Sequence, residues 1–144
     1  MRKGSISFII VVFTIIACKK DRIDAASFQQ CHNAQNLDSL SISNTLIGSW
    51  TWSKQYCFWP DKTIKANKKV QVTFNSNATF TVFENSNVIA QGNWKLMRVD
   101  NYNNWGLQLN PGSSYLYGRI LLCNDQVLFN NSFIDGCDNL FYRS

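Results

Sequence analysis

The sequence predicts an all-β protein, an eight-stranded up-and-down antiparallel barrel that follows a short export signal. Three observations support this fold class. From Leu46 onward, short runs alternate apolar and polar residues, which is typical of half-buried strands. Turns rich in Asn and Ser separate these runs. No segment of helical period reaches the usual helix length after the leader, so we expect no helix in the rest of the chain.

The chain begins with a leader. Arg2 and Lys3 give it a positive start, and the run from Ile6 to Ala17 is apolar and uncharged. That run is about a dozen residues long, whereas a membrane-spanning helix needs roughly 20. Residues 1–17 are therefore predicted to be a signal peptide.

The leader ends on Ile15-Ile16-Ala17-Cys18, which resembles the lipobox of bacterial lipoproteins. The resemblance implies that Cys18 carries a diacylglycerol and becomes the first residue of the mature chain. Each buried methylene contributes about 0.8 kcal/mol, so several acyl chains anchor a protein almost permanently. Lys19 follows the cysteine, which favours an outer-membrane lipoprotein of the cell envelope, facing the periplasm or the cell surface. The alternatives are an ordinary signal peptide with an incidental Cys18, or an uncleaved anchor.

The segment after the leader is rich in Ser, Asn, Gln and Asp and contains the single histidine, His32. It shows no sustained periodicity. We therefore predict that residues 18–44 form the lipidated cysteine and a flexible tether. Residues 45–144 remain for the domain, and about 100 residues are enough to bury one hydrophobic core.

Eight strands are predicted within this domain. The run Val70-Gln71-Val72-Thr73-Phe74 alternates most clearly, and a turn of Asn and Ser leads into a returning strand, as in a hairpin. Both prolines fall between runs, where they interrupt no ladder. Eight strands in simple succession favour an up-and-down barrel, which has no exposed edge. The predicted strands are 46–54, 70–74, 79–83, 88–96, 106–110, 114–122, 126–130 and 139–143.

Gly48-Ser49-Trp50 on the first predicted strand and Arg143 on the last match the Gly-x-Trp and the closing arginine of lipocalins. The chain resembles the small lipocalin-like domains of Bacteroidota lipoproteins over nearly the whole domain. The resemblance implies that Trp50 plugs the closed end of the barrel and that Arg143 lies across its face. A desolvated cation–π pair of this kind contributes about 2 kcal/mol. We expect Gly48, Trp50 and Arg143 to be structural, and an ordinary core tryptophan of another β-barrel is the alternative.

Apart from Cys18, four cysteines remain, and an even number in an exported protein indicates disulfides. Four cysteines allow three pairings. In an eight-stranded meander, Cys57 follows the first strand and Cys137 precedes the last, so both lie at one end. Cys31 and Cys123 lie at the other end. We therefore predict the disulfides Cys57–Cys137 and Cys31–Cys123, each contributing about 2–4 kcal/mol.

Composition argues against several classes of function. Removal of residues 1–17 takes away two basic residues and no acidic one, which lowers the formal net charge from +5 to +3. No concentrated basic face or nucleic-acid motif is recognisable, so we expect no nucleic-acid partner. The acidic residues show no recognisable pairing, and neither a phosphate loop nor a nucleophile elbow is present. The cysteines are far apart and His32 has no partner histidine. We expect no enzyme activity, catalytic residue, cofactor or metal.

Two functions remain, besides attachment to a membrane through the N-terminal lipid. The first is a binding barrel that holds a small apolar or amphipathic ligand at its open end, below an aromatic lid. Core packing explains most of the aromatic residues equally well. The second is a non-enzymatic module that binds an envelope protein or a glycan through Asn-rich turns such as residues 101–105. The candidate ligand or lid residues are Phe58, Trp59, Trp52 and Trp94.

Overall fold

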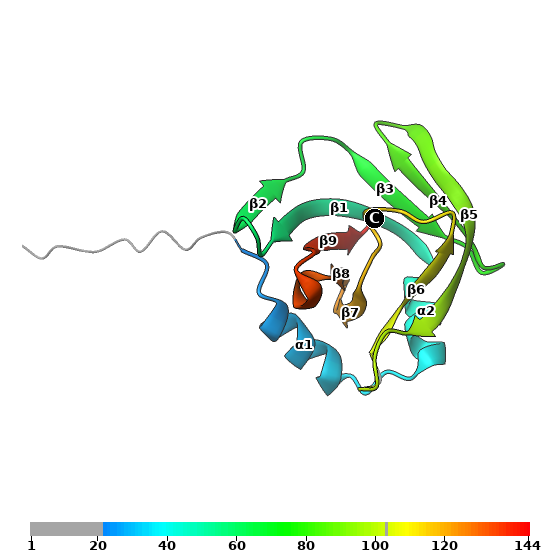
Figure 1. The fold of residues 1–144 in the computed structure, drawn as a ribbon. Helices are drawn as coiled ribbons and strands as arrows, with labels where there is room; N and C mark the ends of the chain where they lie inside the picture. The colour runs from blue at the N-terminus through cyan, green and yellow to red at the C-terminus, as the bar shows by residue number, and fades with distance from the viewer. Residues whose placement is uncertain (1–21, 103) are drawn as a thin grey trace, which may run out of the picture.

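The computed structural model describes residues 22–102 and 104–144 (Figure 1). The predicted signal peptide and Cys18 lie outside these residues, and their assignment stays a prediction. The strands are β1 (Gly48–Cys57), β2 (Lys62–Lys65), β3 (Val70–Phe74), β4 (Thr79–Glu84), β5 (Asn87–Arg98), β6 (Trp105–Asn110), β7 (Arg119–Cys123), β8 (Gln126–Asn130) and β9 (Cys137–Arg143). The helices are α1 (Ala25–Ala34), α2 (Ser39–Leu46) and the short 3-10 helix η1 (Ser132–Ile134).

These strands form one antiparallel sheet in the order β2-β1-β3-β4-β5-β6-β7-β8-β9, which closes through pairing of β1 with β9. The first half of β1 pairs with β3 and the second half with β2. Because β2 and β3 follow one another along the same edge of β1, they act as one interrupted strand. The predicted eight-stranded antiparallel barrel is confirmed.

One predicted strand is much shorter than expected, and one observed strand has no predicted counterpart. The strand predicted over 114–122 begins only at Arg119, because residues 111–118 form a loop that folds into the barrel and buries Leu116 completely. The short strand β2 was not predicted.

The expectation of no helix after the leader is wrong. Helix α1 and most of α2 lie within residues 18–44, the stretch predicted as a tether, and each helix begins at an aspartate cap. The Asp24 carboxylate accepts a hydrogen bond of 3.1 Å from the Ser27 N–H, and Asp38 accepts one of 2.8 Å from the Ser41 N–H. Such caps satisfy backbone donors that a helix leaves unpaired at its first turn.

The two helices cover different parts of the barrel. Helix α1 lies outside, along β7 and β8, whereas α2 covers the end of the barrel at which β1 begins (Figure 1). Ile42 and Leu46 of α2 are fully buried in the barrel core. We call the end that α2 covers the closed end. The opposite end, with the connections 58–61, 85–86, 111–118 and 131–136, is the mouth.

The barrel has a core on each side of its wall. The inner core contains buried aromatic side chains in edge-to-face pairs, among them Phe129 and Phe141, whose ring centroids lie 5.7 Å apart. The outer core lies under α1. A bulge between Trp52 and Lys54 in β1 changes the alternation, so that Trp52 belongs to the inner core and Tyr56 to the outer one. The buried residues of the outer core are Ile23, Tyr56, Leu121, Leu128 and Leu140.

Both predicted disulfides are confirmed. Cys57 and Cys137 are directly paired residues of β1 and β9 at the mouth, with Cα atoms 4.1 Å apart. Cys31 of α1 is joined to Cys123 at the end of β7, with Cα atoms 5.6 Å apart. The second bond fastens the C-terminal end of α1 to the closed end. Disulfides of this kind are typical of proteins outside the cytoplasm.

Candidate binding site

The closed end is sealed by the residues that the lipocalin resemblance emphasises. Trp50 is fully buried, and the Arg143 guanidinium carbon lies 4.3 Å from the centre of its ring. Gly48 has a φ of +124°, and a Cβ at this position would lie 2.9 Å from Nη1 of Arg143. A side chain at Gly48 would therefore be strained and would displace the arginine. The geometry is the one that the resemblance implies.

These residues also complete the end of α2. The last carbonyls of a helix have no partner inside the helix. The Trp50 indole N–H donates a hydrogen bond of 2.7 Å to the Leu46 carbonyl, and Arg143 donates to the carbonyls of Thr45 and Ile47. A cation at a helix C-terminus is also favoured by the helix dipole. Sequence reasoning gave Trp50 and Arg143 the task of closing the barrel but missed the helix that they hold in place.

The mouth is filled by side chains from several strands and from the loop 111–118. Tyr115 packs edge-to-face on Trp52, with ring centroids 5.6 Å apart, and donates a hydrogen bond of 3.1 Å to Glu84. Lys68 also binds Glu84, at 2.7 Å, and this contact lowers the pKa of the carboxyl. The Trp52 indole donates to the Asn139 side chain. The predicted ligand position at the open end is thus occupied by the protein's own residues.

The four predicted ligand or lid residues fall into two groups. Trp52 and Trp94 belong to the inner core, with 5% and 6% of their surface exposed, and they pack edge-to-face on Tyr115 and Phe74. Trp94 also lines two smaller surface pockets, of about 140 and 210 Å³. Phe58 and Trp59 are 61% and 81% exposed on the turn between β1 and β2. The structure therefore does not bring the four residues together.

A surface groove lies where the barrel wall is weakest. Strands β6 and β7 are joined through a single residue pair, Gly106 with Arg119. Gly118, with a φ of +100°, brings its carbonyl so close that a Cβ on Gly106 would lie 2.7 Å from it. Beside this close approach is a groove of about 330 Å³, which we call the seam groove. Its lining consists of Met97, Val99, Gly106, Leu107, Tyr117, Gly118, Asn131, Phe133 and Ile134.

The seam groove collects exposed apolar side chains. Met97, Tyr117, Phe133 and Ile134 are 42%, 52%, 37% and 64% exposed, and all four line it. Clustered exposed apolar groups mark ligand or partner sites more often than scattered ones do. The volume of the groove lies at the lower end of the range for small-molecule sites, roughly 300–1,000 Å³.

A charged pair stands behind the apolar wall. The Arg119 guanidinium carbon lies 3.8 Å from the centre of the Phe133 ring, and Nη2 forms an ion pair of 2.9 Å with Asp100. A side-chain hydrogen bond from Asn104, followed by backbone hydrogen bonds and the charge of Arg119, lowers the pKa of Asp100. Nε of Arg119 is buried and has no hydrogen-bond partner among the described residues. The groove therefore combines apolar walls with a nearby cationic donor.

One buried carboxylate fixes the segment that carries Phe133 and Ile134. Asp138, 1% exposed, accepts hydrogen bonds from the backbone N–H groups of Asn131 and Ser132, both at 2.8 Å. It also accepts them from the Asn130 amide at 3.0 Å and the Ser132 hydroxyl at 2.9 Å. Four donors on one side chain hold the loop 131–136 in a single geometry.

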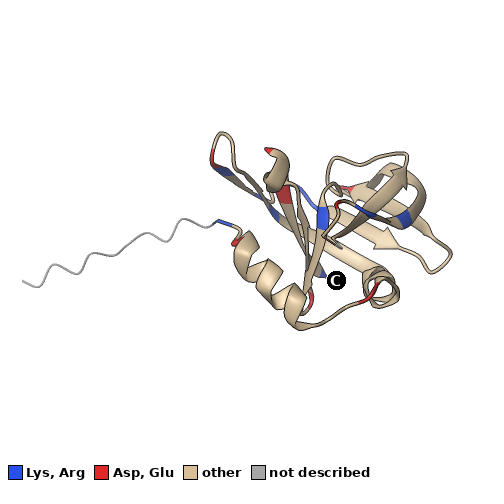
Figure 2. Cartoon of the chain, turned by 60° about the horizontal axis from the view of Figure 1, so that its bottom comes forward, with Lys and Arg blue, Asp and Glu red and all other residues tan. Residues whose placement is uncertain are grey.

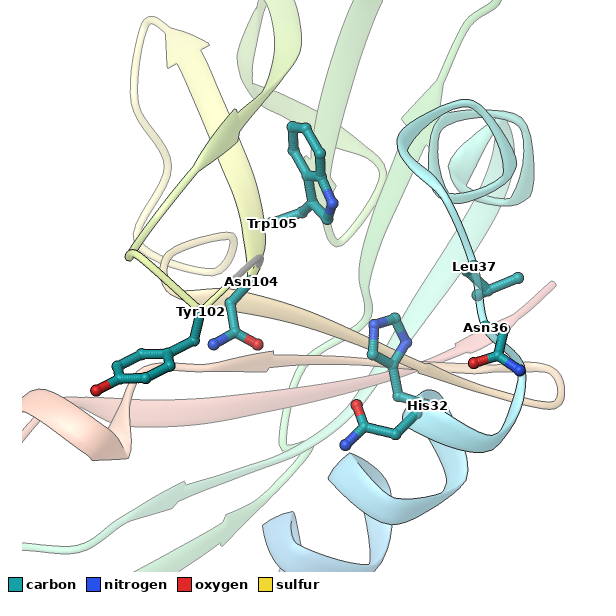
Figure 3. A pocket seen from close by; sticks show the side chains of 7 residues that line it. His32, Asn36, Leu37, Tyr102, Asn104 and Trp105 are labelled. Atoms are coloured by element: carbon teal, nitrogen blue, oxygen red, sulfur yellow. The ribbon is translucent and has the colours of Figure 1, made fainter.

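A second, more polar pocket of about 280 Å³ lies near the closed end, between the end of α1 and the loop before β6 (Figure 3). His32 Nδ1 accepts a hydrogen bond of 3.1 Å from the Leu122 N–H, so the neutral ring carries its proton on Nε2. Burial lowers the pKa of His32. The lining is His32, Asn33, Asn36, Leu37, Tyr102, Asn104 and Trp105. Sequence reasoning singled out residues 101–105 but could not place His32 opposite them.

The positions of Lys, Arg, Asp and Glu are spread along several strands and loops of the ribbon in Figure 2. Within residues 22–102 and 104–144, no group of three or more His, Cys, Asp or Glu side chains is placed to hold a metal ion. No helix in this part of the chain is long and apolar enough to cross a membrane.

None of the family models, curated proteins or solved structures compared with the chain matches it. Its class therefore rests on geometry: the protein is a closed eight-stranded antiparallel β-barrel with a plugged end, a form compatible with a lipocalin-like fold.

Proposed function

We propose that this protein is a non-enzymatic, membrane-anchored lipoprotein whose barrel binds a small apolar or amphipathic ligand in the seam groove. The observation that carries the ligand site is the meeting of four exposed apolar side chains in one groove of about 330 Å³. The anchor is supported by the lipobox-like sequence that ends at Cys18 and by two disulfides, which suit an exported protein.

The ligand site differs from the one expected from the sequence. Trp50, Phe129 and Phe141 pack against neighbouring side chains inside the barrel and line none of the surface grooves described above. An eight-stranded barrel has an interior just wide enough to be filled by its own side chains. We therefore place the ligand outside the wall, where a chain of methylenes would cover Met97 and Ile134 and a polar end would lie near Arg119.

A titration with decanoate, below the concentration at which it forms micelles, tests the ligand site. At ten times the dissociation constant, a bound ligand stabilises the folded state by about 1.4 kcal/mol, or roughly 4–6 °C in melting temperature. Met97→Glu places a negative charge in the groove, where it would repel the carboxylate and the acyl chain alike, and it should abolish most of the shift. Val88→Glu is the matched control, because Val88 is a 52% exposed apolar residue of the same strand and lies nine positions away.

Two results would count against the ligand site: no melting shift with decanoate in the wild type, or equal losses in the two glutamate variants. The anchor is tested separately by labelling cells with an alkyne fatty acid. Wild-type protein should incorporate the label, and Cys18→Ser should not. Label retained by Cys18→Ser would refute the assignment of the lipid to this residue.

The polar pocket near the closed end favours a second function, binding of a glycan by an interaction module. Tyr102 is 85% exposed and Trp105 half-buried, and both stand with Asn104 on one side of the pocket, across from Asn36 (Figure 3). Aromatic faces and amides together suit the apolar face and the hydroxyl groups of a sugar. Binding of N-acetylglucosamine disaccharide, measured by titration calorimetry and lost in Tyr102→Ala, would support this function. Unchanged binding in the variant would exclude the pocket.

A further inference from the structure

The path of α1 determines the end of the barrel at which the N-terminal segment joins the domain. The outer core holds Ile23 beside Tyr56, and the Arg22 guanidinium lies 5.6 Å from the Tyr56 ring. Arg22 also forms an ion pair with Asp61 in the turn between β1 and β2. The described chain therefore begins at the mouth, as Figure 1 shows beside β2.

The N-terminal end of α1 is held at the mouth and cannot move to the closed end without breaking contacts. Its far end is bonded through Cys31 to Cys123 at the closed end, and its near end is fixed by the buried Ile23. The helix thus runs along the barrel from mouth to closed end. If the lipid is attached where we propose, the chain passes directly from the lipid to the mouth.

The length of chain between anchor and barrel is short. Cys18 precedes Arg22 by four residues, and four residues span at most about 14 Å when fully extended. A lipid on Cys18 would therefore hold the mouth within about 14 Å of the membrane surface. The closed end and its polar pocket lie at the opposite end of the barrel.

The turn at the mouth has the side chains that a lipid surface attracts. Phe58 and Trp59 are consecutive and project with 61% and 81% of their surface exposed. The preceding residue is Cys57, whose disulfide to Cys137 ties the base of the turn to β9. Tryptophan is enriched at membrane–water interfaces because its ring is apolar and its N–H is polar. A fixed turn also loses little conformational freedom when it binds.

Charge near the turn has the sign that anionic headgroups favour. Lys62 and Lys65 are exposed on β2, directly after the turn. The single acidic residue of the turn, Asp61, is paired with Arg22 and accepts a hydrogen bond from Tyr56. Basic residues close to an anionic membrane contribute about 1 kcal/mol each.

We propose that the mouth faces the bilayer and that the Phe58–Trp59 turn inserts into the boundary between headgroups and acyl chains. This inference rests on the proposed lipid anchor at Cys18. It orients the protein with the polar pocket at His32 pointing away from the membrane, and it gives the two most exposed aromatic residues of the β1–β2 turn a lipid partner.

Tryptophan quenching by brominated lipids tests the orientation. The lipidated mature protein is purified from membranes and reconstituted into vesicles of phosphatidylethanolamine and phosphatidylglycerol, with or without bromine on the acyl chains. Trp59 is one of five tryptophans, so we expect brominated vesicles to quench about a fifth of the emission. Trp59→Phe should remove this quenching. Trp59→Phe with Tyr102→Trp moves an exposed tryptophan to the closed end and should also show none.

Flotation of the same vesicles separates the two proposals. Protein that floats but shows equal quenching with and without Trp59 overturns the orientation and leaves the anchor intact. Quenching of a tryptophan placed at position 102 overturns it as well. Protein that does not float overturns the anchor and, with it, the orientation.

Discussion

Replacement of Asp138 should show how far one carboxylate fixes the wall of the seam groove. In Asp138→Ala, the N–H groups of Asn131 and Ser132 and two side-chain donors lose their acceptor. A hydrogen bond contributes about 1 kcal/mol net, and more when the acceptor is charged. Four lost contacts, partly replaced by water, therefore predict a loss of about 3–4 kcal/mol in the free energy of unfolding. Urea denaturation followed by tryptophan fluorescence measures this loss.

Asp138→Asn is the matched control. The amide oxygen can keep the three contacts that Oδ1 receives, and the Ser132 hydroxyl can reverse its role and accept from the new NH2 group. We expect a loss of about 1 kcal/mol in this variant. Decanoate binding should weaken in Asp138→Ala more than in Asp138→Asn, because Phe133 and Ile134 lose their fixed position. Equal losses of stability in the two variants would show that the hydrogen bonds to Asp138 do not hold the loop 131–136.

Three further predictions concern the closed end. Arg143→Met should cost about 2–4 kcal/mol of unfolding free energy, because Trp50 and the carbonyls at the end of α2 lose their cation; a loss below about 0.5 kcal/mol would contradict the plug. Burial lowers the pKa of His32 in the folded protein. Below the ordinary histidine pKa of about 6.5, the unfolded chain is therefore protonated at His32 more fully than the folded one, and the free energy of unfolding falls as the pH drops. His32→Asn should reduce that slope in denaturation between pH 7.5 and 5, and an unchanged slope would exclude His32 as its source. Joint replacement of Cys31 and Cys123 by Ser should cost about 4 kcal/mol on the loop-entropy model, because the intact Cys57–Cys137 bond shortens the loop that the lost bond closes, and it should speed hydrogen exchange in α1; slow exchange there would show that packing alone holds the helix.

The barrel could be predicted because each strand is recognisable from the pattern of a few neighbouring residues. Alternation in runs such as Val70–Phe74 reflects the two faces of a strand, and simple succession of strands constrains which ends meet. That constraint was sufficient to pair Cys57 with Cys137 and Cys31 with Cys123 correctly. The closing pair of Trp50 and Arg143 followed from the resemblance rather than from periodicity.

The helices could not be recognised from apolar periodicity because they bury few residues. Helix α1 has no residue that is fully buried, although its Cys31 is covalently attached to the barrel. A signal was nevertheless present at both helix starts. Asp24 and Asp38 each stand three residues before a serine whose N–H they cap. Capping, rather than hydrophobic pattern, was the informative feature.

Most of the loop 111–118 was wrongly predicted as part of a strand. It has an apolar residue, Leu116, that is as deeply buried as any strand residue, so local hydrophobicity alone could not distinguish the loop from a strand. The same loop fills the mouth through Tyr115, which removes the ligand position expected there.

The seam groove had no sequence signature because it arises from tertiary arrangement. It exists where β6 and β7 share a single residue pair, and it brings Met97 of β5 beside Ile134 of η1. Those residues lie 37 positions apart in the chain, and no local pattern connects them. The glycines at 106 and 118 indicate close backbone approach, yet only the fold shows that they face each other.

Mapping of amide chemical shifts during a decanoate titration reports where on the barrel the ligand binds. We predict saturable shifts concentrated on both walls of the seam groove, with the barrel interior and the polar pocket at His32 unaffected. Shifts centred on inner-core residues such as Phe129 and Phe141, or on His32, would contradict the account. So would a spectrum that decanoate leaves unchanged. The residues expected to shift are Met97, Val99, Gly106, Leu107, Tyr117, Gly118, Phe133 and Ile134.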